Sequence, residues 1–188
     1  TRFEDAIQAC SHCLRLGHAT TGVLLNFGTC CLETGKDSEA KAVYNKVLER
    51  DESSAAALYN LAVLYEKEQD WKESIRCYRK LAETTNAPEP LFRLGVALHK
   101  SNEWAQAAEV YAKCVEQKAD WAQAWSNLGV AYLKCDQADK AEAAFDKVLE
   151  LSPDDADALM GLSVVYGEQQ QTDKLLDVYT KLAKIKQD

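Results

Sequence analysis

Residues 122–155 read AQAWSNLGVAYLKCDQADKAEAAFDKVLELSPDD, and this stretch decides the fold. Seven of its positions form a pattern of large apolar, small and turn-forming residues: Trp125, Leu128, Gly129, Tyr132, Ala141, Phe145 and Pro153. The intervals of three and four residues within each half predict two amphipathic helices, each with one apolar face.

The pattern recurs at a nearly fixed period along the whole chain. Leu94 lies 34 residues before Leu128 and Leu162 lies 34 after it, while Leu61 precedes Leu94 by 33 residues and Phe27 precedes Leu61 by 34. An aromatic residue recurs in step in the second halves: Tyr44, Tyr78, Tyr111, Phe145 and Tyr179. Five units are therefore predicted, at 21–54, 55–87, 88–121, 122–155 and 156–188, and residues 1–20 fit the second helix of a truncated unit, which suggests an excised fragment.

The spacing W-x2-L-G-x2-Y, A-x3-F, P in residues 122–155 resembles the tetratricopeptide repeat family at all seven positions. The resemblance implies an all-α, right-handed superhelical solenoid of antiparallel helix pairs. Helices are expected at 2–16, 21–34, 38–50, 55–68, 71–83, 90–101, 104–117, 121–134, 138–151, 156–169 and 172–186. Residues 86–90 form the strongest break, but the period continues across it, so one continuous array is predicted.

The composition excludes several classes of protein. A net charge of −8 disfavours a general nucleic-acid or anionic-membrane surface. The chain holds no apolar run of about 18 residues, the length a transmembrane helix needs. Seven cysteines are an odd number for a disulfide framework, and several fall at core positions of the repeat. Reduced thiols in a cytoplasmic compartment are expected.

The pairs Cys10–Cys13 and Cys30–Cys31, with His12 and His18 nearby, raise a zinc hypothesis. Adjacent Cys30 and Cys31 would point about 100° apart on a helix, so packing thiols are the favoured interpretation and no metal or cofactor is expected. No nucleotide-binding glycine loop is present, and no nucleophile and base are brought together, so the fragment is not expected to be an enzyme.

A candidate binding site comes from the first helix of each unit, because first helices line the concave face in the family that this sequence resembles. The residue before the repeating Leu or Phe is one inward position, and it reads Asn26, Asn60, Arg93, Asn127 and Gly161. A carboxamide both donates and accepts hydrogen bonds, so recurring Asn predicts a hold on an extended peptide backbone. The arrangement is similar to asparagine ladders in other tetratricopeptide superhelices. The alternative is that Asn is common at this register or bonds within the array.

Other inward positions predict the character of the ligand. Lys67, Lys100 and Lys134 join Arg93 there and favour an acidic peptide, unless these lysines are simply solvated. Tyr59 and Phe92 would set side-chain preference.

The predicted function is a protein–protein interaction module, scaffold or adaptor that binds an extended, acidic peptide segment. One alternative is a structural segment of a large assembly that uses the convex face or the array ends, and another is a regulatory region of an enzyme outside the fragment. Self-association through the ends is expected, because Phe3, Ile7 and Leu14 lack an upstream partner and Leu176, Val178 and Ile185 lack a cap.

Overall fold

The computed structural model describes residues 2–16 and 20–185, and this part of the chain is all helix and turn, with no strand. It divides into two compact units, unit 1 at residues 1–86 and unit 2 at residues 87–188. Unit 1 holds α1 (Arg2–Arg15), α2 (Thr21–Glu33), α3 (Asp37–Arg50), α4 (Ala55–Lys67) and α5 (Trp71–Thr85). Unit 2 holds α6 (Pro88–Lys100), α7 (Trp104–Gln117), α8 (Ala122–Lys134), α9 (Ala138–Leu151), α10 (Ala156–Glu168) and α11 (Thr172–Ile185).

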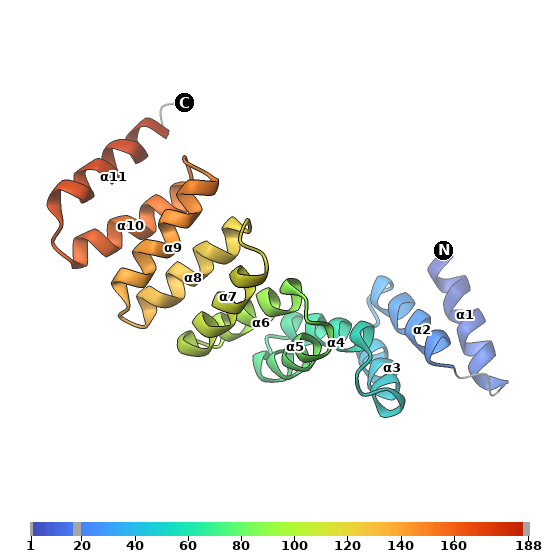
Figure 1. Cartoon of the computed structure of the whole chain (residues 1–188). Helices are drawn as coiled ribbons and strands as arrows, with labels where there is room; N and C mark the ends of the chain where they lie inside the picture. Colours follow the sequence, from blue (N-terminus) through green and yellow to red (C-terminus); the bar gives the residue numbers. More distant parts are fainter. Residues whose placement is uncertain (1, 17–19, 186–188) are drawn as a thin grey trace. The chain divides into compact units, whose positions relative to one another are not determined.

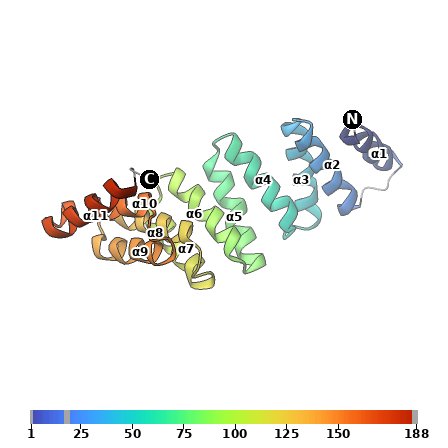
Figure 2. The same ribbon diagram turned by 90° about the horizontal axis from the view of Figure 1, so that it is seen from above.

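Each unit is built from helix pairs whose members follow each other in the chain. Within unit 1, α2 packs on α3 and α4 on α5, and within unit 2 the pairs are α6–α7, α8–α9 and α10–α11 (Figures 1 and 2). We call α2, α4, α6, α8 and α10 the first helices and α3, α5, α7, α9 and α11 the second helices. The all-α fold class is confirmed, whereas continuity of the array across residue 86 concerns the relation between the units and stays a prediction.

One type of turn ends every first helix. The second residue after the helix has a positive φ between 57° and 73°, at Gly35, Gln69, Asn102, Asp136 and Gln170. The next amide donates to the carbonyl five residues earlier at 2.8–3.0 Å, which closes a helix-capping turn. Only one of the five positions is glycine, so four side chains are held in the left-handed region.

The interruption between α5 and α6 is shorter than the sequence predicts. α5 continues to Thr85, and Asn86 then adopts a left-handed conformation with φ 44°. Ala87 is extended, as a residue before proline must be, and Pro88 begins α6 two residues before the expected start.

Aromatic side chains of the second helices fill the core. Tyr44, Tyr78, Tyr111 and Phe145 are each 0% exposed. A glycine of the partner first helix faces three of these rings, since a Cβ built at Gly28, Gly95 or Gly129 would lie 2.5–2.7 Å from a ring carbon. The prediction that small residues allow the paired helices to approach closely is therefore confirmed.

The last helix corrects part of the expectation about the chain ends. Val178 is only 5% exposed, and Ile185 packs against the apolar cluster of α9 and α10. Both side chains are therefore already covered within unit 2, without a further capping helix. Leu176 and Tyr179 are the large apolar side chains of α11 that are exposed, at 65% and 54%. At the other end Ile7 is half-buried, and the side chains of Phe3 and Leu14 lie outside what the structure describes.

Candidate functional site

The first helices present the predicted ligand-binding residues at one register. All five are 13 residues long, and their sixth residue is Asn26 or Asn60 in unit 1 and Arg93, Asn127 or Gly161 in unit 2. Asn26 and Arg93 are exposed, while Asn60 and Asn127 are half-buried. Within each unit the predicted polar side chains are therefore accessible to solvent to different degrees.

Asn127 has a neighbour inside the array. Burial raises the pKa of Tyr111, and the Asn127 carboxamide, which lies beside the Tyr111 hydroxyl, opposes that rise. In the next pair the ring is Phe145, which has no hydroxyl, and the equivalent residue is Gly161, packed directly against the ring. This position of a first helix thus contacts the aromatic ring of the preceding second helix. The Tyr111 hydroxyl nevertheless has no hydrogen-bond partner of normal geometry among the described residues, so the alternative that Asn bonds within the array stays a prediction for Asn127.

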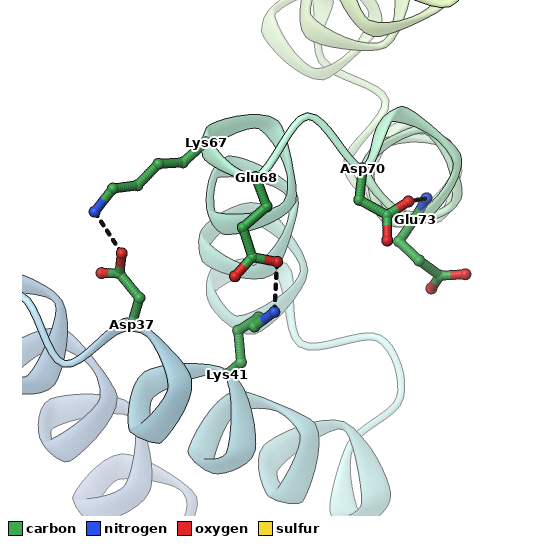
Figure 3. Close-up of polar contacts among 6 residues, drawn as sticks. All are labelled: Asp37, Lys41, Lys67, Glu68, Asp70 and Glu73. Atoms are coloured by element: carbon green, nitrogen blue, oxygen red, sulfur yellow. Dashed lines mark hydrogen bonds and ion pairs between the residues drawn. The ribbon is translucent and has the colours of Figure 1, made fainter.

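Lys67 is neutralised by a residue of its own unit. Its ammonium pairs with Asp37, the first residue of α3, and Lys41 pairs with Glu68 at 2.6 Å in the same contact between α3 and α4 (Figure 3). A charge that is already paired attracts an acidic ligand less strongly. The sequence could not separate Lys67 from its equivalents, because Asp37 lies 30 residues earlier in the chain.

The equivalent lysines of unit 2 lack such a partner. Lys134 is the last residue of α8, and the place that Asp37 holds in α3 is taken in α7 by Trp104. Within residues 20–185 neither Lys100, Lys134 nor Arg93 makes an ion pair. All three are exposed.

His99 adds a titratable group to this part of unit 2. Its ring packs on Trp104 with the two centroids 4.6 Å apart. Burial lowers the pKa of His99, and the nearby Lys100 and Lys134 lower it further. The two lysines of α6 and α8 therefore act on the same imidazole, which places their charges in one neighbourhood. We call Arg93, Lys100, Asn127 and Lys134 the first-helix face of unit 2.

The predicted aromatic contacts differ in availability. Tyr59 is 40% exposed and meets Tyr78 edge-on at 6.3 Å. Phe92 is stacked on Trp121 at 4.5 Å and also touches Tyr111, so much of its ring is used within unit 2. Tyr59 is the better placed of the two to meet a ligand.

The thiols lie mostly in the core. Cys30, Cys31, Cys77 and Cys114 are buried, and burial raises the pKa of Cys114 to about 11, so this thiol is protonated at neutral pH. The described residues contain no group of three or more His, Cys, Asp or Glu side chains placed to hold a metal ion. His18, considered in the zinc hypothesis, lies outside them.

Comparison with known families identifies the fold. Tetratricopeptide repeats match residues 21–54, 57–90, 91–121 and 122–155, more than half of the chain. The chain belongs to the tetratricopeptide repeat family. Tetratricopeptide repeats are typically non-enzymatic scaffolds for protein–protein interaction. Comparison with curated proteins gives no match.

Solved tetratricopeptide structures share this fold at low identity. YrrB, described as a TPR protein with an unusual peptide-binding site, is 23% identical, with a TM-score of 0.84 over 97% of this chain and 94% of that chain. A MamA structure is 21% identical, with a TM-score of 0.81 over 89% and 92%. MamA from Desulfovibrio magneticus RS-1 is 20% identical, with a TM-score of 0.77 over 89% and 95%. At these identities the likeness concerns the fold alone.

None of the helices in the described part of the chain is both long and apolar enough to cross a membrane.

Proposed function

We propose that the first-helix face of unit 2 binds an extended, acidic segment of a partner protein. The observation that carries this proposal is the set of unpaired cations Arg93, Lys100 and Lys134 on α6 and α8, two helices whose only acidic residue is Glu89. Although the whole chain has a net charge of −8, the positive electrostatic potential of this surface attracts carboxylates, and its cations can form charge-assisted hydrogen bonds with them. YrrB, which has a peptide-binding site, supports the idea by fold only.

Asn127 would hold the ligand backbone with its carboxamide, which lies beside the Tyr111 hydroxyl without a hydrogen bond of normal geometry to it. A carboxamide offers two donor hydrogens and an acceptor oxygen, which match the carbonyl and the N–H of a peptide group. In unit 1, Asn26, Asn60 and Tyr59 would provide backbone and side-chain contacts of the same kind. Because Lys67 is paired with Asp37, unit 1 adds little charge to the attraction.

The test is selection of peptides from a display library of short unstructured segments. Wild-type protein should enrich acidic peptides, and the double variant Lys100→Glu/Lys134→Glu should not. Each single variant, Lys100→Glu or Lys134→Glu, is compared with Lys113→Glu as the matched control, because all three reverse one charge and Lys113 is an exposed residue of α7, a second helix of unit 2. Binding should weaken as ionic strength rises, since exposed charges are screened. Equal loss in Lys113→Glu would contradict a site on the first helices.

Asn127 needs a control of its own because it also contacts Tyr111. Asn127→Ala should reduce the affinity for a selected peptide by about 1–3 kcal/mol if a peptide group is left unsatisfied. Tyr111→Phe removes the hydroxyl but leaves the ligand-binding face, so it should change stability and leave affinity unchanged. If the two variants have the same effect on affinity, Asn127 is a packing residue and does not bind peptide.

A second candidate function rests on the exposed side chains of α11. Leu176 and Tyr179 present an apolar surface that a neighbouring subunit of an assembly would cover. In both cases the chain acts as an adaptor and not as an enzyme. The buried, protonated thiol of Cys114 and the six other free thiols fit a reducing, cytoplasmic location.

A further inference from the structure

The second helices of unit 2 border a cleft that the proposed peptide site does not use. It measures about 330 Å3 and lies between α7 and α9, with α8 as its floor. Trp125 and Tyr132 come from the floor, Ala112 and Glu116 from α7, and Ala143 and Lys147 from α9. We call this space the unit 2 cleft. Its lining is mostly apolar, because alanine stands where longer side chains could cross it.

This cleft lies on the side of α8 away from the first-helix face. Trp125 precedes Asn127 by two residues, and Tyr132 precedes Lys134 by two. Two residues turn a helix by about 200°, so each aromatic residue lies nearly opposite its polar neighbour. The unit 2 cleft and the first-helix face are therefore separate surfaces of α8.

Unit 1 contains the equivalent space with a different lining. There α3 and α5 border a cleft of about 480 Å3 over α4. Asn45 replaces Ala112, Arg76 replaces Ala143 and Leu58 replaces Trp125, each at the same position of its helix. Lys80 of α5 pairs with Glu52 at 2.9 Å beside this cleft. The same place in the repeat is thus polar and charged in unit 1 and apolar in unit 2.

Trp125 offers the unit 2 cleft an aromatic surface whose polar group is already satisfied. The indole Nε1 donates to the Ala119 carbonyl at 2.8 Å, so the ring needs no further hydrogen bond. The side chain is half-buried. Half-covered tryptophans with a satisfied N–H are favourable anchors for an apolar side chain of a partner.

The charges at the unit 2 cleft favour a partner in which an acidic residue lies next to the apolar residue that enters the cleft. Lys140 lies 5.5 Å from the Tyr132 ring centroid and makes no ion pair within the described residues. Lys147 stands on the same helix and is held by Glu150 at 2.6 Å. Glu116 borders the opposite wall. A carboxylate on the α9 side would therefore meet Lys140 as a free cation.

We infer that the unit 2 cleft is a second docking site, which takes one aromatic side chain of a partner protein with an acidic residue next to it in sequence. Its volume is at the lower end of the range of about 300–1,000 Å3 for binding pockets, which suits a single side chain. The aromatic ring packs on Trp125 between the alanines of α7 and α9, and the neighbouring carboxylate pairs with Lys140. The chain then engages protein partners through two separate surfaces of unit 2.

The experiment is a nuclear magnetic resonance titration of the full chain with the peptide Ac-Gly-Phe-Glu-Gly-amide. The chain has 4 tryptophans, and Trp125→Phe assigns the Trp125 indole signal. That signal should shift and saturate, while the Trp71 indole of unit 1 should stay in place. Replacing Glu by Lys in the peptide should weaken binding about two- to fivefold, as expected for one exposed ion pair. Lys140→Gln should abolish that difference.

Ala143→Arg closes the cleft with the residue that unit 1 already carries at this position. Arginine is a good helix former and Ala143 is exposed, so the variant should fold, which circular dichroism checks. Affinity should fall at least about tenfold, the loss of a contact worth 1.4 kcal/mol. Ala42→Arg, the same change at the equivalent position of α3, should bind as wild type. The inference is overturned if Trp125 shows no saturable shift, if Ala143→Arg retains affinity, or if the shifts fall on Lys100 and Lys134 instead.

Discussion

A methyl group added at Gly161 tests the packing of α10 on α9. The new Cβ would lie 2.4 Å from Cζ of Phe145 and 2.6 Å from both Cε atoms, well inside the 3.5–4.0 Å at which carbon atoms attract. Phe145 is 0% exposed, and a Cβ at Gly129 would meet the same ring at 2.7 Å, so the ring is confined from two first helices. Overpacking of this kind costs about 1–3 kcal/mol.

Gly167 of the same helix supplies the matched control. No heavy atom lies within 4 Å of a Cβ built there, so Gly167→Ala gains helix propensity without a clash. That gain is at most about 1 kcal/mol, and Gly161→Ala gains it too. We therefore expect Gly161→Ala to be less stable than Gly167→Ala by about 1–3 kcal/mol, the clash alone.

Urea unfolding followed by circular dichroism measures both variants. A repeat array can unfold in more than one step, so a local measurement is also needed. Hydrogen exchange of the α10 amides should likewise be faster in Gly161→Ala than in Gly167→Ala. Phe145→Leu replaces the ring by a shorter side chain. In that background Gly161→Ala should lose most of its destabilising effect. Equal stability of the two alanine variants would refute the reasoning, because it would show that the Phe145 ring moves aside freely.

Two further predictions concern the turns and the pH dependence of unit 2. Gln69→Gly and Gln170→Gly place glycine at a left-handed backbone position and should each raise the free energy of unfolding by up to about 1 kcal/mol. Urea titrations measure this change, and a loss of stability would show that the glutamine side chains stabilise the turns. The ammonium of Lys174 at 2.8 Å, together with the hydroxyl of Tyr166, lowers the pKa of Glu142. A lowered carboxyl pKa adds stability above its unfolded value, and this stability is lost as the pH falls through the folded value. Acid should therefore destabilise wild type more than Glu142→Gln, as measured by unfolding at pH 7 and below about pH 4, and equal acid sensitivity would exclude this role.

The sequence by itself determined the repeat and its helices. The intervals between Trp125, Leu128 and Phe145 gave helix ends that agree with the structure within two residues, and α7 and α9 agree at both ends. This succeeds because one apolar face per helix must be buried, and its spacing is written directly in the chain. The packing role of the small residues could be predicted for the same reason.

The identity of the polar partners was decided only by the tertiary structure. Lys67, Lys100 and Lys134 occupy the same register, yet Asp37 neutralises the first, while Trp104 stands in the equivalent place for the last. Asn127 lies beside Tyr111 for a similar reason. Each pairing depends on a residue of the preceding helix, which no local pattern in the first helix records.

The unit 2 cleft could not be predicted from the sequence, because it exists where two short side chains leave space between helices. Ala112 and Ala143 are unremarkable helix residues when read along the chain, and Trp125 conforms to the family pattern. Only when α7 and α9 are placed over α8 do the two short side chains leave the indole partly exposed, while Asn45 and Arg76 line the equivalent space in unit 1. Periodicity predicts which face of a helix is buried. Whether a cleft forms between neighbouring helices depends on the lengths of the side chains that those helices bring together.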